Sequence, residues 1–457
     1  MIDLWFLIQA TVLSAVSALI YIIIGILPGT DETATMAPVA LALLLARIDP
    51  LLVLSWFIAA IIAFKITDAI PVALAGIPGG VMAVPQVPDA LYAKEHGLAD
   101  ALLRKGNSAA LIASVLTLVF TLTVSWILMP IGSWLGTKDS ILGVEVARWF
   151  WILFAGLIVL ALTSRNKILA LLTIPLFALL VQGLRGVYGK SVTVSMFLGI
   201  TIGPIIYELI QSLDKSYRRN IARRGYKEVR LARVGRISVN PFKNLSREEL
   251  AHTSIWSLIT SVLAIVMSPV GLTLLIGDLL RESKKNRLEG SLLAYSTREG
   301  IKLGTYIGGT LIPLFVIGAP TGPMSAGPAR PFFDKISVLD GLSAGEYILK
   351  HYSYTDIFIA LLYSAAISLL ITYPLIVRYS REITLYVFRR ISAESLYGLF
   401  LAIALILAYY DAGLPGIFGA ILVSILSGVL YKQGVSLGVL FMTLVGAPTI
   451  VSLLKLA

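Results

Sequence analysis

One lysine and one aspartate stand inside an otherwise apolar stretch of the sequence at residues 64–69. Their spacing of three residues places Lys65 and Asp68 on one face of a helix. Ionisable side chains within a membrane segment are rare and are commonly functional. Two interpretations stay open. The two residues form a neutralised structural pair, with Lys65 extending to the membrane interface, or Lys65 holds an anionic solute and Asp68 takes a coupling proton or sodium ion.

Two further carboxylates, Asp31 and Glu32, directly follow the sequence Pro28-Gly29-Thr30. Acidic residues in the first turn of a helix are favoured by the helix dipole and can cap the backbone. The alternative is a cation site at a broken helix, where freed backbone carbonyls coordinate sodium and helix N-termini hold a carboxylate.

The Pro/Gly-rich segments recur along the chain as an internal repeat. The pattern I-P-x-x-x-x-G-x-P-x-G occurs at residues 70–80 and again at residues 312–322, with an offset of 242. A second pair supports the first, because Pro28 precedes Pro78 by 50 residues and Pro269 precedes Pro320 by 51. Two matches at nearly one offset indicate an internal duplication.

These segments are candidates for a binding site. Proline removes a backbone donor and breaks a helix, and glycine permits unusual dihedral angles. In lipid the freed backbone groups must find partners in protein or in a water-filled cavity. Paired interruptions in two halves of a chain are typical of a transporter's binding site, whereas kinks that serve only packing are the alternative. The predicted substrate-binding residues are Pro28, Gly29, Thr30, Lys65, Thr67, Pro78, Gly79, Gly80, Gly318, Pro320, Thr321, Gly322 and Ser325, and the predicted ion-coupling residues are Asp31, Glu32 and Asp68.

The composition places these residues in a membrane. The 457-residue chain is 57% hydrophobic and 14% charged, whereas a soluble domain carries about 25% charged residues. Its long apolar runs predict an all-α polytopic membrane protein with roughly 10–12 membrane segments, some of them broken or re-entrant. The first apolar run lacks a basic leader and a cleavage site, so we expect a retained helix. The chain has no cysteine, and its 3 histidines have no zinc-type spacing, so we expect neither a metal centre nor an enzyme.

The net charge of +11 is concentrated in residues 214–253. A basic loop between apolar runs predicts a cytoplasmic location and contact with anionic lipid head groups. No nucleic-acid-binding motif accompanies the charge, so nucleic acid is not expected as a partner. The predicted organisation is a first membrane half at 1–213, the basic loop at 214–253 and a second membrane half at 254–457.

On these motifs the chain resembles the large membrane permease subunit of tripartite tricarboxylate transporters. The resemblance rests on residues 25–29, 77–79 and 89–102 in the first half and on residues 308–313 and 317–322 in the second. It implies two inverted repeats, ion-coupled solute movement in a prokaryotic cell membrane, a small membrane subunit and an extracytoplasmic binding protein. The family's paired Asn before the second Gly-Gly and its Gly-Gly-Ser before the first I-P-G turn are absent, so a stand-alone form stays open and no tricarboxylate is assigned.

The function predicted from the sequence is a secondary active transporter. It would move a small organic anion by alternating access, coupled to protons or sodium, without another cofactor. A channel and a membrane-embedded enzyme are the alternatives, but the repeat suits one central site better than a continuous pore, and no catalytic constellation is evident. Whether the protein forms a homo-oligomer is open.

Overall fold

The fold is described by a computed structural model that covers residues 2–28, 30–141, 143–188, 192–217, 231, 240–335, 337–391 and 393–454. Within these residues, eight helices are long and apolar enough to cross a membrane, and four shorter apolar helices accompany them. The described chain has almost no sheet, so the predicted all-α polytopic membrane fold is confirmed. Most of the basic loop at 214–253 lies outside the described residues, and a helix already begins at Arg247 within it.

The first half contains two interrupted helical segments followed by long helices. Its elements are α1 Leu4–Ile26, α2 Glu32–Leu45, α3 Pro50–Thr67, α4 Ile70–Ala75, the 3-10 helix η1 Val81–Gln86, α5 Val87–Glu95, α6 Ala99–Gly136, the hairpin strands β1 Lys138–Ile141 and β2 Val144–Ala147, α7 Trp149–Thr163, α8 Lys167–Tyr188 and α9 Thr193–Leu213.

The second half repeats this order without the hairpin. Its elements are the short η2 Pro241–Lys243, α11 Arg247–Leu263, α12 Pro269–Glu282, α13 Arg287–Ile312, the π-turn η3 Pro313–Ile317, α14 Pro323–Ala326, η4 Arg330–Phe332, η5 Ser337–Leu339, α15 Ala344–His351, α16 Tyr354–Arg390, α17 Ala393–Ala412, α18 Leu414–Lys432 and α19 Leu437–Leu453.

Packing between the halves follows this correspondence. Helix α6 packs on α13 as its counterpart α16 packs on α3, and α9 packs on α18 as α8 packs on α19. Helices α6 and α16 run antiparallel, because the Ser108 hydroxyl lies 3.3 Å from the Tyr373 hydroxyl whereas Tyr354 donates to the Leu122 carbonyl at 2.5 Å. An inverted relation between the halves remains a prediction, and this antiparallel course supports it.

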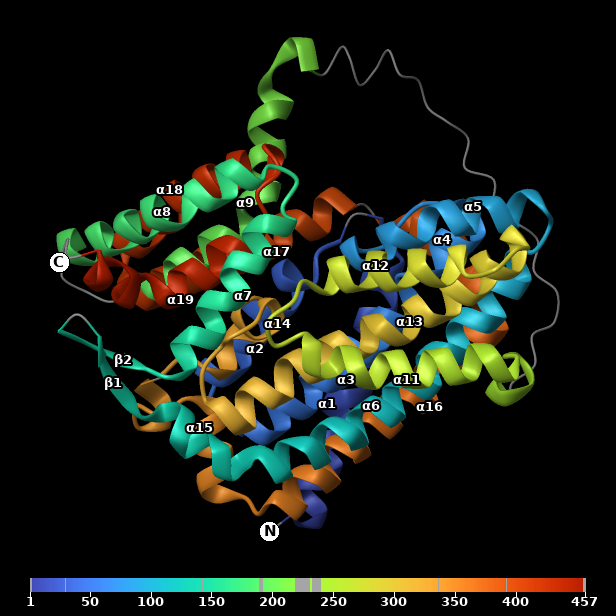
Figure 1. The fold of residues 1–457 in the computed structure, drawn as a ribbon, viewed down its shortest axis with the longest axis horizontal. Coiled ribbons are helices and arrows are strands. Elements are labelled where there is room, and N and C mark those ends of the chain that lie inside the picture. The colour runs from blue at the N-terminus through green and yellow to red at the C-terminus, as the bar shows by residue number, and fades with distance from the viewer. Residues whose placement is uncertain are drawn as a thin grey trace.

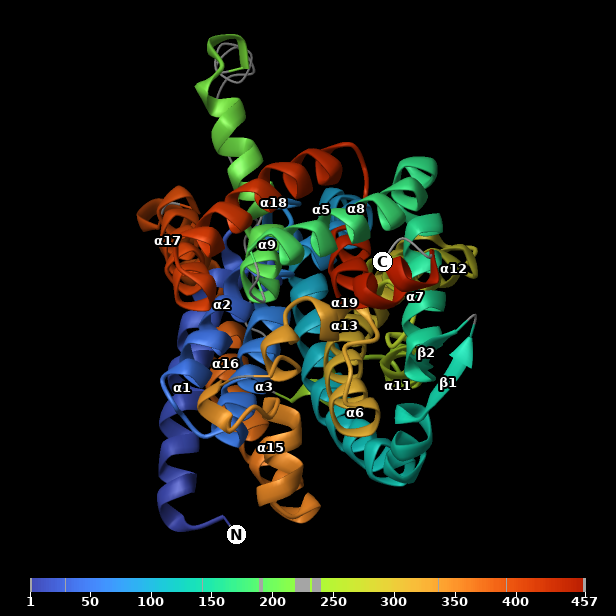
Figure 2. The same cartoon turned by 90° about the vertical axis from the view of Figure 1, so that its left-hand side faces the viewer.

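The helices form two groups. Helices α8, α9, α18 and α19 gather at one end of the molecule, and α1, α3, α6, α11 and α16 at the other (Figures 1 and 2). Helix α13 also belongs to the second group, in which α3 and α13 are the central helices. Every residue of α3 and nearly every residue of α13 is buried, whereas fewer than half of the residues of α1 are. Because α1 leaves large apolar side chains such as Leu4 and Trp5 exposed, its outer face suits lipid rather than water.

Candidate functional site

The two copies of the repeated motif, residues 70–80 and 312–322, have nearly the same backbone. We call them the first and second re-entrant segments. Gly76 ends α4 in the left-handed region with φ 74° and ψ 22°, and Gly318 ends η3 with φ 69° and ψ 10°. Four residues later Gly80 precedes η1 with φ −129° and ψ 173°, and Gly322 precedes α14 with φ −127° and ψ 172°. Only glycine adopts the positive φ of the first pair without strain. The shared sequence motif therefore encodes one turn used twice.

Each segment contains a glycine that lies against the backbone of the helix next to it. A side chain at Gly79 would come within 2.6 Å of the Asp68 carbonyl oxygen, and one at Gly322 within 2.7 Å of the Ala264 and Ile265 carbonyls. The glycines at these two predicted positions are therefore required by close packing.

In the first half, Thr30 joins the broken helix to the re-entrant segment. Its backbone N–H donates to the Gly79 carbonyl at 3.1 Å, and its hydroxyl lies 3.0 Å from the Ile24 carbonyl and 3.1 Å from that of Gly79. Thr30 also forms an isolated parallel bridge with Gly80. Asp31 then caps α2 by accepting from the Ala34 N–H at 3.0 Å. These contacts satisfy backbone groups that the break would otherwise leave without partners.

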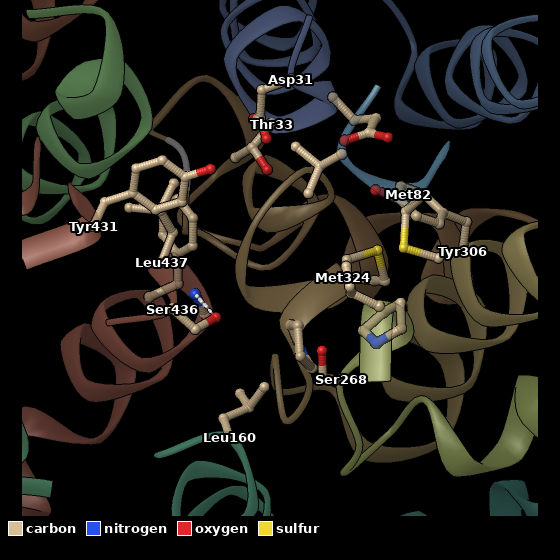
Figure 3. A pocket seen from close by; sticks show the side chains of 17 residues that line it. Asp31, Thr33, Met82, Leu160, Ser268, Tyr306, Met324, Tyr431, Ser436 and Leu437 are labelled. Carbon is tan, nitrogen blue, oxygen red and sulfur yellow. Dashed lines mark hydrogen bonds between the residues drawn. The ribbon is translucent and has the colours of Figure 1, made fainter. Parts of the chain in front are cut away.

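A cavity of about 140 Å³ lies where the helix breaks before α2 and α12 meet the ends of the two re-entrant segments (Figure 3). Both halves contribute an interrupted helix and a re-entrant segment to its wall. It is lined by Asp31, Glu32, Thr33, Val81, Met82, Leu160, Ser268, Pro269, Val270, Tyr306, Pro323, Met324, Tyr431, Ser436, Leu437, Gly438 and Phe441. We call it the central cavity.

A second hollow of about 310 Å³ adjoins the central cavity and shares Asp31, Val81, Tyr431 and Leu437 with it. Pro78, Gly80 and Glu208 also line this side hollow. The two spaces lie between the group of helices around α3 and the group around α9 and α19, so a relative movement of the groups would change their shape.

Three helices of at least 14 residues begin at the central cavity. Glu32 begins α2, the Ser268 hydroxyl caps α12 by accepting from the Gly271 N–H, and Ser436 caps α19 by accepting from the Gly438 N–H. Helix N-termini carry a partial positive charge and present free N–H groups. The wall thus combines features that suit an anion with two carboxylates, Asp31 and Glu32, that suit a cation.

Beside the central cavity runs a buried chain of charged side chains. Lys65 pairs with Glu32, and its Nζ lies 3.5 Å from Asp68 Oδ2. Lys302 of α13 lies 2.5 Å from Asp68 Oδ1 and 2.9 Å from Glu299 Oε2. We call these five residues the charge network; all are at most 2% exposed.

Two neighbours complete the surroundings of the charge network. The Gln86 amide donates to Glu299 Oε1 at 2.5 Å. The Tyr306 ring centroid lies 4.0 Å from Lys65 Nζ, a geometry that stabilises an ammonium group. Because Tyr306 and Glu32 also line the central cavity, the charge network reaches the cavity at its Glu32 end.

The structure brings some predicted residues to the two hollows and leaves others behind them. Asp31, Glu32, Pro78 and Gly80 line the hollows. Lys65 and Asp68 lie in the charge network, and Lys65 faces Glu32 rather than open space. The described structure therefore has Lys65 neutralised by carboxylates, and its predicted contact with a solute stays a prediction.

The other predicted residues have structural contacts. Thr67 donates to the Ala63 carbonyl of its own helix at 2.8 Å, and Ser325 donates to the Gly322 carbonyl at 3.0 Å. Gly318 lines a hollow away from the central cavity. Pro28, Thr30, Gly79, Pro320, Thr321 and Gly322 form the turns behind the cavity wall without lining the central cavity. Gly29 lies outside the described residues.

Sequence reasoning missed the second-half part of the charge network. Glu299 and Lys302 have the same spacing of three residues as Lys65 and Asp68, and they lie ten or more residues before Pro313. That spacing of opposite charges before a repeated I-P motif was the available signal. Gln86 carried no comparable signal, because it is uncharged and belongs to no pattern of spacing in the sequence.

The fold and the site define a multi-pass membrane protein with two similar halves and a cavity between their interrupted helices. The chain matches the tripartite tricarboxylate transporter TctA family over residues 12–442, and it belongs to that family. It is therefore a component of a membrane transporter, and its family is one of transporters rather than of enzymes. Comparison with curated proteins and with solved structures gave no match.

Proposed function

We propose that this protein is a secondary active transporter that moves a small organic anion of the carboxylate class by alternating access, coupled to protons or sodium. The observation that carries the proposal is the central cavity, whose wall contains residues from both interrupted helices and from both re-entrant segments. Discontinuous helices around one cavity between two repeats are the usual form of a transporter's binding site.

The chemistry of the cavity wall supports an anion together with a cation. The N-terminal ends of α2, α12 and α19 favour the negative charge of a carboxylate. Asp31 and Glu32 supply negative charge close to those ends, so a coupling cation would offset the charge of the solute. The modest volumes of the two hollows suit a small solute.

A channel is disfavoured because the two halves of the chain meet at one central cavity, an arrangement that suits a single binding site better than a continuous pore. An enzyme is disfavoured by the family. The description of the family as tripartite supports partner proteins, for which we propose a substrate-binding protein and a small membrane subunit. A prokaryotic cell membrane as the location is part of the same proposal.

The proposal is tested by uptake into proteoliposomes. Radiolabelled mono-, di- and tricarboxylates, amines and sugars are offered under imposed proton or sodium gradients. We expect accumulation of a carboxylate that collapses when the gradient is dissipated. Accumulation of an amine or a sugar, without that of any carboxylate, would refute the assignment of the solute.

A matched pair of variants tests the cavity. Val81 lines both hollows, and Val81→Phe should fill the shared space and reduce uptake at least tenfold. Leu370 is 71% exposed on the outer face of α16, and Leu370→Phe should leave uptake unchanged. Equal uptake by both variants would place the solute elsewhere.

A further inference from the structure

The charge network does not balance. It contains three carboxylates, Glu32, Asp68 and Glu299, but only two ammonium groups, Lys65 and Lys302. Within the described part of the chain, no third basic side chain forms an ion pair with any of the five. A net negative charge buried away from water is strongly unfavourable unless a further cation neutralises it.

The neighbouring charged clusters differ from the charge network because water reaches them. Where α5, α12 and α13 meet, Arg298 and Arg281 face Asp89 and Asp278. Arg281 also lies 3.8 Å from Glu282, but the Glu282 side chain is 74% exposed, so this additional carboxylate is hydrated. Between α6 and α11, Lys105 pairs with Glu249 at 2.5 Å. Arg104 and its partner Asp100 on α6 form a further pair of opposite charges.

We propose that the charge network binds one proton, held by Glu299, and that this proton is the coupling ion of the transporter. The inference rests on the proposed function and names its ion. It stands on the arrangement of the five charges, on their burial, and on the position of the Glu32 end at the central cavity.

Geometry distinguishes Glu299 from the other two carboxylates. Asp68 lies between two lysines, and Glu32 pairs with Lys65, so each has a strong reason to stay ionised. Glu299 has one lysine and the neutral amide of Gln86 as partners. Its Oε2 lies 2.9 Å from Lys302 Nζ, an ammonium group that Glu299 shares with Asp68. An amide offers both a donor and an acceptor, so Gln86 can bind either the ionised or the protonated carboxyl group.

The remaining polar neighbours do not supply the missing positive charge. The Tyr295 hydroxyl donates to the Ala69 carbonyl at 3.1 Å, and the Tyr306 ring packs on Lys65. Both are neutral phenols that leave the charge count unchanged. A proton entering from the central cavity would meet Glu32 first, and Lys65, Asp68 and Lys302 connect Glu32 to Glu299.

The test uses the purified full-length protein without any solute, so its failure leaves the transporter proposal intact. A proton bound only by the folded protein stabilises it below the pH at which that proton is lost. The melting temperature of the wild type should therefore fall as pH rises, by about 2 °C per pH unit. Glu299→Gln, which mimics the protonated carboxyl, should abolish this slope.

Glu249→Gln is the matched control, since Glu249 is also a buried glutamate paired with a lysine, but in a balanced pair. It should lower the melting temperature at every pH and keep the slope. Replacing choline with sodium at constant ionic strength should change nothing. Stabilisation by sodium that disappears in Glu299→Gln would overturn the proposal, because the missing cation would then be sodium.

Infrared spectroscopy locates the proton. The wild type should show the C=O stretching band of a protonated carboxyl group in a nonpolar site, and Glu299→Gln should lose it. If Glu299→Gln does not fold, Glu32→Gln serves, because two carboxylates then balance two lysines and the band should also vanish. A band that persists in both variants, or a wild type with no pH slope, would refute the proposal.

Discussion

The two re-entrant segments share a backbone and differ in what holds them. The first is tied to three other parts of the molecule: to the first helix break through Thr30, to α3 through the Asp68 carbonyl, and to α13 through Gln86 at the end of η1. The second is held by its own Ser325, which donates to the Gly322 carbonyl and also accepts the Gly322 N–H.

The difference extends to unused polar groups. The Thr321 hydroxyl is buried and forms no hydrogen bond within the described structure, whereas the Thr30 hydroxyl has three carbonyl acceptors within 3.1 Å. The shared motif therefore fixes the turn, while the residues that differ between the two segments decide how firmly the turn is attached. We infer that the first segment is the rigid side of the cavity and that the second is freer to move.

Removing the lysine of α13 that lies beside the first segment, Lys302, should have the largest effect. Lys302→Met leaves Asp68 and Glu299 buried without their shared cation, so we expect a loss of about 3–5 kcal/mol in unfolding free energy. Chemical unfolding in mixed micelles measures it. Lys105→Met should cost less, because the lysine of this pair is 20% exposed and water can take its place beside Glu249. Adding Asp68→Asn to Lys302→Met should recover part of the loss; additive losses would deny the coupling between these residues.

The shared backbone can be tested next. Gly79→Ala and Gly322→Ala should each cost about 1–3 kcal/mol, because the new methyl group would meet backbone carbonyls that cannot move aside. Gly318→Ala is the control: it has a positive φ but open space around it, so about 1 kcal/mol is expected. The comparison fails if one of the first two variants is as mild as the control.

Thr30→Val should separate the two segments. It keeps the shape of the side chain but removes the hydroxyl that bridges the first break, and a lost buried hydrogen bond costs about 1–3 kcal/mol. The chain has no cysteine, so a single Val81→Cys reports on the segment directly. We expect Thr30→Val to speed its labelling by a polar maleimide, and an unchanged labelling rate would contradict the anchoring role.

Thr321→Val should have the smallest effect. The hydroxyl has no hydrogen-bond partner, so replacing it with an apolar group of the same shape should be neutral or slightly stabilising, within about 0.5 kcal/mol. The melting temperature checks this. If Thr321→Val is instead clearly destabilising, the second segment is anchored as firmly as the first, and the inferred difference in their freedom to move is wrong.

Much of the architecture follows from local patterns. The long apolar runs, the scarcity of charge and the repeated Pro/Gly motif predicted the helical membrane fold and the equivalence of the turns around Pro78 and Pro320. Each depends on neighbouring residues only, because proline and glycine act on their own backbone. Asp31 capping α2 was likewise expected from its place before the helix.

Only the tertiary structure decided which charges meet. Lys65 and Asp68 could be placed on one helix face from their spacing, but Glu32 is 33 residues away from Lys65 and Lys302 is 234 residues away from Asp68. Ion pairing depends on distance in space, and the crossing of α3 and α13 sets that distance. The sequence by itself determined where the chain must break; the packing of the two halves determined that the breaks enclose a cavity and that an unbalanced charge network lies beside it.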